Sequence, residues 1–199
     1  MISSLILASS SQIRAALLQN AGVECKIVPA RIDEEAIKQS LLTEDATPRD
    51  VADTLAEMKA RKVAEKGLGA LTLGCDQVLS FKGAILSKPS SVEEAREQLL
   101  SLRGETHQLL SAAVVYEELK PVWRHVGVAR LTMRDFSDDY LSDYLARNWE
   151  SIRWSVGGYK IEEEGVRLFR HIQGDTFTIQ GLPLLELLSY LTLRGTLPQ

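Results

Sequence analysis

The chain has 199 residues, of which 45% are apolar and 25% are charged, and its formal net charge is −4. This length fits one domain or one domain with two lobes, and the composition is ordinary for a soluble globular protein. The slight acidity argues against broad binding to nucleic acid or to acidic membranes. No basic segment with a long apolar run opens the chain, and no stretch approaches the roughly 20 apolar residues of a membrane span. We therefore expect one cytoplasmic domain, residues 1–199, without a nucleic-acid or membrane partner.

The first informative stretch joins an apolar run to three serines. Leu5–Ala8 is unbroken and apolar, which predicts a strand buried on both faces. Ser9–Ser11 follow, and apolar residues then recur at helical spacing from Ile13 to a stop at Gly22. A strand, a polar loop and a helix start direct backbone N–H groups and hydroxyls at one place, where phosphate could bind and Arg14 could contact it. The serines could instead only cap the helix.

Further elements are expected along the rest of the chain. Apolar runs predict strands over 24–28, 70–79, 109–116, 122–133 and 166–172, with turns at 81–84 and 117–121. Helices are predicted over 35–42, from Thr47-Pro48 to the glycines at 67 and 69, over 92–102 behind a capping box, from Ser137, and from Leu182-Pro183 to Gly195. Residues 155–165 are expected to form loops.

The remaining cysteines and histidines show no metal-site spacing. Cys25 and Cys75 lie in apolar, strand-like runs, so we expect free thiols in a reducing compartment. His107, His125 and His171 are interpreted as surface or core residues because they lack zinc-type spacing.

The strand expected over 70–79 contains a carboxylate. Asp76 lies inside an apolar run, where a charge is costly unless it is paired or bound to a metal. Gly74 removes a side chain nearby, which lets either a ligand or another backbone approach. This stretch therefore favours a functional site over a purely structural strand.

Three more charged residues lie at or near element ends. Glu34 precedes a helix, where an acid could simply favour the helix dipole. Lys59 lies beside the apolar stripe of its helix, and most such lysines only extend to the surface. Lys88 precedes Pro89 and is therefore expected in extended backbone.

These groups together indicate phosphoanhydride chemistry. The chain has neither a P-loop nor a Gly-x-Ser-x-Gly elbow. Two carboxylates, Glu34 and Asp76, could hold Mg²⁺, and three cations, Arg14, Lys59 and Lys88, could hold phosphate. All five lie in the first half of the chain.

The motifs resemble a known family. In chain order, LILASSSQIR, IDE, LAEMKA, LGCDQV, LSKP, LRGETHQL and QGLPLLELL are similar to the Maf family of nucleoside triphosphate pyrophosphatases over nearly the whole chain. The resemblance implies hydrolysis of a nucleoside triphosphate to the monophosphate and diphosphate with a divalent metal, Mg²⁺ or Mn²⁺. It also implies an α/β fold with a mixed central sheet and flanking helices, in two lobes around a substrate cleft, often as a homodimer.

The resemblance assigns roles to residues. It places Ser9, Ser11 and Arg14 in the phosphate loop, and Glu34, Lys59, Asp76 and Lys88 in the catalytic set, with Asp76 as proton acceptor and Glu34 and Asp76 as metal ligands. Gln77 and Glu162 are more similar to the branch acting on 7-methyl-GTP than to the branch acting on dTTP and UTP. Ile13 fits neither branch, because the 7-methyl-GTP branch has Trp at this position and the dTTP and UTP branch has Arg. We expect a guanine-type substrate, with a dTTP or UTP pyrophosphatase as the alternative.

Two other classes of function compete with an enzyme. A nucleotide-sensing regulator of cell division would need cations for phosphate, but it would not need Asp76 and Glu34 together. A purely structural α/β domain would leave five polar groups at strand ends unexplained. The acid-plus-lysine set therefore favours the enzyme.

Overall fold

A mixed seven-stranded sheet forms the centre of the computed structural model, which describes residues 5–67 and 69–198. The strand order is β2-β1-β3-β5-β6-β7, and β4 pairs with β3. The strands are β1 (Leu5–Leu7), β2 (Cys25–Ile27), β3 (Leu71–Phe81), β4 (Ala84–Leu86), β5 (Thr106–Glu117), β6 (Lys120–Met133) and β7 (Phe169–Gln173). β1 is parallel to β2 and β3, and the other pairs are antiparallel. The expected mixed sheet is confirmed.

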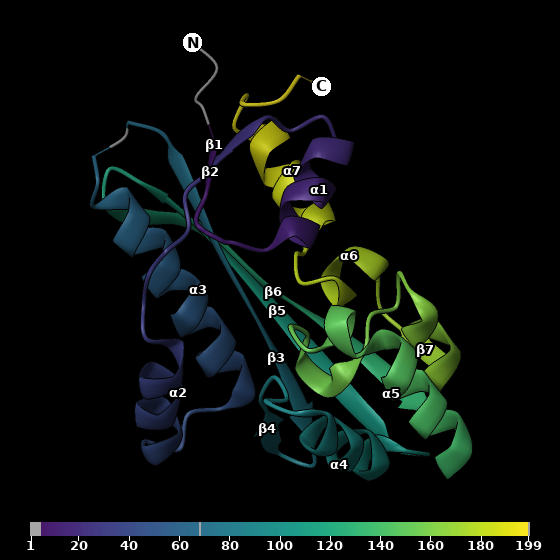
Figure 1. The fold of residues 1–199 in the computed structure, drawn as a ribbon. Coiled ribbons are helices and arrows are strands. Elements are labelled where there is room, and N and C mark those ends of the chain that lie inside the picture. The colour runs from purple at the N-terminus through teal and green to yellow at the C-terminus, as the bar shows by residue number, and fades with distance from the viewer. Residues whose placement is uncertain (1–4, 68, 199) are drawn as a thin grey trace.

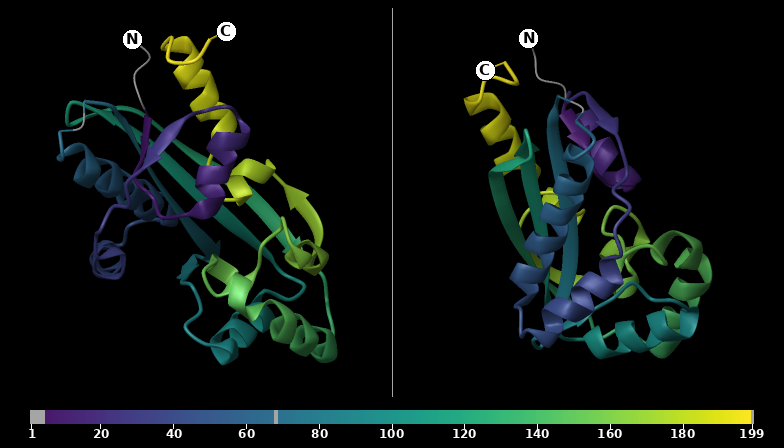
Figure 2. Two further views of the ribbon diagram at one scale, coloured as in Figure 1. Left: turned by 45° about the horizontal axis from the view of Figure 1, so that its top comes forward. Right: turned by 90° about the vertical axis from the view of Figure 1, so that its left-hand side faces the viewer.

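Helices cover this sheet in two groups. They are α1 (Gln12–Asn20), α2 (Glu34–Thr43), α3 (Pro48–Ala64), α4 (Val92–Leu102), α5 (Asp138–Ile152), α6 (Thr176–Ile179) and α7 (Leu184–Leu193), with 3₁₀ turns η1 (Val156–Gly158) and η2 (Glu164–Leu168). Figure 1 shows one group, α1, α7, α3 and α2, at the top and along the left-hand side of the long strands, and another, α4, α5 and β7, toward their lower right end. We call these groups the first and second lobes; β3, β5 and β6 run through both (Figure 2).

Each helix group buries its own apolar face. One cluster lies between α1, α7 and the β1–β3 region, and includes Leu7, Leu18 and Leu187. A second lies under α4 and α5 and includes Leu99 and Tyr144. A third fills the space between α3 and the sheet. Because the long strands contribute to all three clusters, the lobes share one sheet.

The helix α3 packs unusually close to β3. It begins with a capping box between Thr47 and Asp50. A Cβ added at Gly74 would lie 2.1 Å from the Ala56 carbonyl oxygen and 2.5 Å from the Ala60 nitrogen. Of the two expected uses of Gly74, the structure therefore shows close approach of another backbone.

Several expected boundaries were wrong. Glu34 is the first residue of α2 rather than the residue before it, with Asp33 as N-cap. The strand predicted over 166–172 begins only at Phe169, because the residues before it form η2. The β5–β6 turn is shorter than 117–121, since Glu118 and Leu119, with positive φ, span it. α6 was not predicted.

The thiols and imidazoles have the expected structural roles. Cys25 and Cys75 are free, and Cys75 is buried. His107 is buried in the second-lobe core, whereas His125 is half-buried and His171 is exposed. In residues 5–67 and 69–198, no group of three or more His, Cys, Asp or Glu side chains is placed to hold a metal. The same residues contain no helix long and apolar enough to span a bilayer.

Candidate active site

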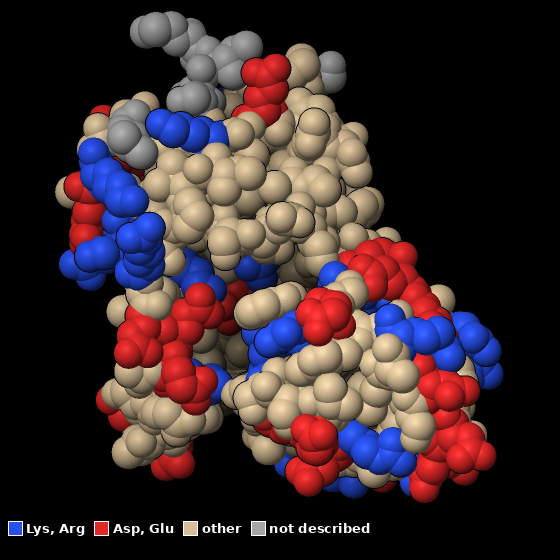
Figure 3. Space-filling view, viewed as in Figure 1, with Lys and Arg blue, Asp and Glu red and all other residues tan. Residues whose placement is uncertain are grey.

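A cavity of about 720 Å³ lies between the two lobes. Figure 3 shows a recess there, with lysine, arginine and acidic side chains around it. All ten residues expected at the site line this cavity: Ser9, Ser11, Ile13, Arg14, Glu34, Lys59, Asp76, Gln77, Lys88 and Glu162. They come from both lobes and from widely separated parts of the chain.

An interruption in strand pairing opens the sheet to this cavity. β1 pairs with β3 as far as Leu73, and β4 pairs with the same edge of β3 from Leu79. Among the described strands, none pairs with this edge over residues 74–78, while β5 pairs continuously on the other edge. Asp76 and Gln77 lie in this interval. Their side chains point to opposite faces of β3, yet both reach the cavity because it passes this open edge.

The serine loop after β1 both caps α1 and holds Arg14. Ser11 is the N-cap and accepts a 3.3 Å hydrogen bond from the Arg14 amide. Ser9 accepts from the Arg14 Nη1 at 3.3 Å. The guanidinium also donates to the backbone carbonyls of Gly181 (2.8 Å) and Cys75 (3.1 Å). The capping interpretation is therefore right for Ser11, and the same loop fixes a cation at the cavity.

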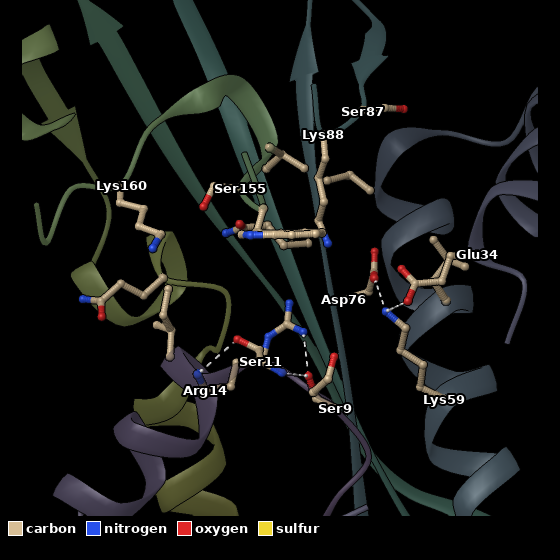
Figure 4. A pocket seen from close by; sticks show the side chains of 18 of the residues that line it. Ser9, Ser11, Arg14, Glu34, Lys59, Asp76, Ser87, Lys88, Ser155 and Lys160 are labelled. Atoms are coloured by element: carbon tan, nitrogen blue, oxygen red, sulfur yellow. Dashed lines mark hydrogen bonds and ion pairs between the residues drawn. The ribbon is translucent and has the colours of Figure 1, made fainter. Parts of the chain in front are cut away.

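Opposite this loop, one ammonium joins two carboxylates (Figure 4). Lys59 Nζ lies 2.6 Å from Asp76 Oδ1 and 3.0 Å from Glu34 Oε1. The side chains of Lys59 and Asp76 are each 8% exposed, whereas that of Glu34 is 49% exposed. Lys59 therefore does not extend to the surface: α3 directs it at β3.

Burial changes the acidity of Asp76. Removal from solvent raises its pKa above the ordinary value, and the positive charges of Lys59 and Arg14 oppose that rise. A carboxylate whose pKa is raised toward neutral pH is a more effective proton acceptor than a free one. The local geometry thus suits Asp76 for general base catalysis.

The two carboxylates also fit a divalent cation. Asp76 and Glu34 converge on one point, which the Lys59 ammonium occupies. Mg²⁺ is commonly held by one or two carboxylates while phosphate and water supply its other ligands. A pair of oxygen donors beside a phosphate-binding loop is such a set. Glu34 and Asp76 could therefore hold Mg²⁺ or Mn²⁺ together with a bound polyphosphate.

Two lysines lie near the β4–α4 connection. Lys88 is exposed there and lines the cavity. Lys38, on α2, donates to Ser87 Oγ at 2.5 Å and pairs with Glu35. Lys38 was not predicted from the sequence. Its position four residues after Glu34 was the available signal, because that spacing puts both on one helix face.

Three consecutive acids of the second lobe, Glu162 to Glu164, differ in their partners and only Glu162 lines the cavity. Glu163 accepts from Ser151 and Lys160, and Glu164 pairs with Arg147. Glu162 is exposed and lines the cavity. The three are therefore not equivalent solvated charges, since two of them hold the local backbone in place and Glu162 remains available to a ligand.

The other two residues expected to contact the base are more restrained. The Gln77 amide nitrogen donates to Ser111 Oγ and to the carbonyls of Thr178 and Ile179. Those bonds fix the amide and leave its oxygen for any further contact. Ile13 is half-buried and packs partly against the first-lobe core.

Comparison with known proteins finds relatives over nearly the whole chain. Residues 4–193 match the family model described as Maf-like protein. The chain is 65% identical to a nucleoside triphosphate pyrophosphatase of Roseobacter denitrificans, covering 98% of both chains. It is 49% identical to a 7-methyl-GTP pyrophosphatase of Brucella abortus, covering 94% of both. A solved HAM1 protein of Coxiella burnetii aligns with 67% of this chain and 74% of its own, at 17% identity and a TM-score of 0.47.

Proposed function

The chain belongs to the Maf-like family, and from that premise we propose that it is a nucleoside triphosphate pyrophosphatase. The reaction is hydrolysis of a nucleoside triphosphate to the monophosphate and diphosphate. The observation that supports it is the buried Asp76–Lys59 pair, which faces the serine loop and Arg14 of α1 across one cavity. A binding module would gain nothing from a buried carboxylate beside a negatively charged ligand, because the two repel.

The chemical step follows from the free oxygen of Asp76. Its Oδ1 accepts from Lys59, and among the described residues none donates to Oδ2. We assign Oδ2 to accept the proton of the attacking water. The water oxygen bonds to the α-phosphorus, the bond from that phosphorus to the bridging oxygen breaks, and diphosphate leaves.

The cations act on the phosphate chain. Arg14 is held by carbonyl oxygens and Ser9, so its position is set before the substrate binds. Lys88 reaches the cavity from the other lobe. Fixed positive groups of this kind stabilise the charge that develops on phosphate oxygens in the transition state.

The same carboxylates would hold the divalent metal, Mg²⁺ or Mn²⁺. Glu34 and Asp76 are its proposed ligands, and Lys59 keeps both carboxylates directed at one point in its absence. When bound, such an ion polarises phosphate oxygens and lowers the pKa of a coordinated water.

We further propose a guanine-type base. Guanine presents N1–H and N2–H₂ donors, which the carboxylate of Glu162 can accept together, whereas uracil and thymine present mainly acceptors. An N7-methylated guanine is cationic, which an acidic wall favours. The 7-methyl-GTP pyrophosphatase among the relatives supports this choice.

A release assay tests the function. The purified chain with Mg²⁺ or Mn²⁺ would be incubated with GTP, 7-methyl-GTP, ITP, UTP and dTTP, and the products identified by chromatography. We expect diphosphate and the monophosphate. Orthophosphate as the first product would reject the proposal, because it requires attack at the γ-phosphorus. Tight nucleotide binding without any turnover would support the regulator instead.

A further inference from the structure

The second-lobe wall contains one exposed aromatic side chain. Trp154 is 68% exposed, lies between α5 and η1, and lines the cavity. The other aromatic residue in the described lining, Tyr159, is 4% exposed, and its hydroxyl is bonded to His107. Exposure of the apolar indole surface to water is unfavourable. A flat ligand that covers the ring would remove this surface from water and would therefore be favoured.

The indole is supported from its own helix end. The Arg153 guanidinium lies 5.1 Å from the Trp154 ring centre and 5.4 Å from that of Trp149. Arg153 is itself paired with Glu150. Cation–π contacts of this kind restrain the ring. Much of the Trp154 surface nevertheless stays exposed.

The two walls of the cavity have complementary chemistry. The first lobe contributes the cation Arg14 and the Asp76–Lys59 pair, which suit a phosphate chain. Trp154 and Glu162 belong to the second lobe and supply a flat face and a hydrogen-bond acceptor, which suit a nucleobase. A nucleotide with its phosphates against the serine loop therefore extends its base toward Trp154.

We propose that Trp154 is the base-stacking residue of this cavity and takes a purine ring on its open face. This inference rests on the proposed function, since it assumes a nucleoside triphosphate in the cavity. Stacking on an aromatic side chain contributes the equivalent of about 5- to 100-fold in affinity for a base. The contact is made equally in the ground state and the transition state, so it acts on KM and leaves kcat nearly unchanged.

The test combines kinetics with binding. Trp154→Ala should raise KM for GTP about 5- to 100-fold with kcat nearly unchanged, and Trp154→Phe should restore most of the loss. The inhibition constant of inorganic tripolyphosphate, which has no base, should not change. Leu185→Ala, at a leucine that is 51% exposed and outside the cavity lining, is the matched control for loss of an exposed apolar side chain.

A readout independent of turnover separates this inference from the proposed function. Binding of the α,β-methylene analogue of GTP should quench tryptophan fluorescence in the wild type and in Trp123→Phe, but not in Trp154→Phe. Quenching that depends on Trp154 without any diphosphate release would reject the proposed function and keep the stacking role. Four outcomes would each overturn the stacking role. The first two are an unchanged KM for GTP in Trp154→Ala and a tripolyphosphate inhibition that weakens as much as GTP binding does. The other two are quenching that persists in Trp154→Phe and a failure of the wild type to bind the analogue.

Discussion

Lys59 donates a 2.6 Å hydrogen bond to Asp76 from the neighbouring helix, and both side chains are almost fully buried. The bond occupies Oδ1, and among the described residues none donates to Oδ2. Glu34, which is far more exposed, is the second acceptor of the ammonium. A buried pair that also faces a solvent-filled cavity is better explained by chemistry than by stability, because desolvation cancels much of its attraction.

Replacing Asp76 by asparagine tests this assignment. Asp76→Asn keeps the shape but removes the proton acceptor, and loss of a general base costs about 10²- to 10⁴-fold in rate. Folding should persist, since Glu34 still pairs with Lys59. The rate is measured as steady-state diphosphate release at saturating metal. Circular dichroism checks that the variant is folded.

Asparagine at an acid outside the cavity is the control for that variant. Asp139, an exposed acid in the first turn of α5, should tolerate the same change with little effect. Wild-type turnover by Asp76→Asn would show that another group takes the proton.

Folding stability should fall in mild acid because of His107. Burial lowers the pKa of His107 from 6.5 to about 4. Between these values the unfolded chain binds a proton that the folded chain does not, so stability is full above pH 6.5 and decreases as pH falls through that window. The loss amounts to about 3 kcal/mol by pH 4.

His107→Gln removes that titration. Glutamine can still contact the Tyr159 hydroxyl, which lies 2.7 Å from the imidazole Nε2 in the native protein. Urea unfolding at several pH values should show a steeper decline for the wild type than for the variant. Parallel curves for the two proteins would contradict the prediction.

Polar groups inside apolar patterns were the part of the site that could be predicted. Asp76 breaks the pattern of a buried run, and it lies at the cavity together with the serines after β1 and Lys88 before Pro89. Such conflicts between local pattern and residue type are expected at functional sites. The helix that begins at Pro48 was predictable for the opposite reason: its N-cap Thr47, the proline in its first turn and the helical sequence that follows all indicate the same structure.

Features that depend on distant contacts could not be predicted. The open edge of β3 exists because β1 and β4 are only three residues long, and strand pairing is not encoded locally. α6 has four residues, too few to show a helical period. Trp154 stood in a stretch without periodicity, and only the fold shows that it faces the cavity.

Alanine at Gly74 should damage both stability and activity. The added Cβ would overlap the α3 backbone at Ala56 and Ala60, and overpacking of this kind costs about 3 kcal/mol. If the chain still folds, α3 must shift, and Lys59 shifts with it away from Asp76. The midpoint temperature of thermal unfolding and kcat should therefore both fall.

A second substitution tests the cause. Adding Ala60→Gly to Gly74→Ala should not rescue the variant, because two of the three nearest contacts of the added Cβ are to backbone atoms. A full rescue would mean that side-chain crowding alone is responsible.

Glutamine at position 162 should change which base is preferred. Glu162 is the one acid of its run left without a structural partner among the described residues, and it lines the cavity. In Glu162→Gln an amide replaces the acceptor pair that guanine needs and adds a donor that suits uracil and thymine. A missing partner in a desolvated site costs about 1–3 kcal/mol, so kcat/KM for GTP and 7-methyl-GTP should fall roughly 5- to 100-fold relative to UTP and dTTP. Glu163→Gln is the matched control: its carboxylate is bonded to Ser151 and Lys160, so this change should affect stability rather than the order of substrates. A wild type that prefers UTP or dTTP, or an unchanged order in Glu162→Gln, would show that another residue recognises the base.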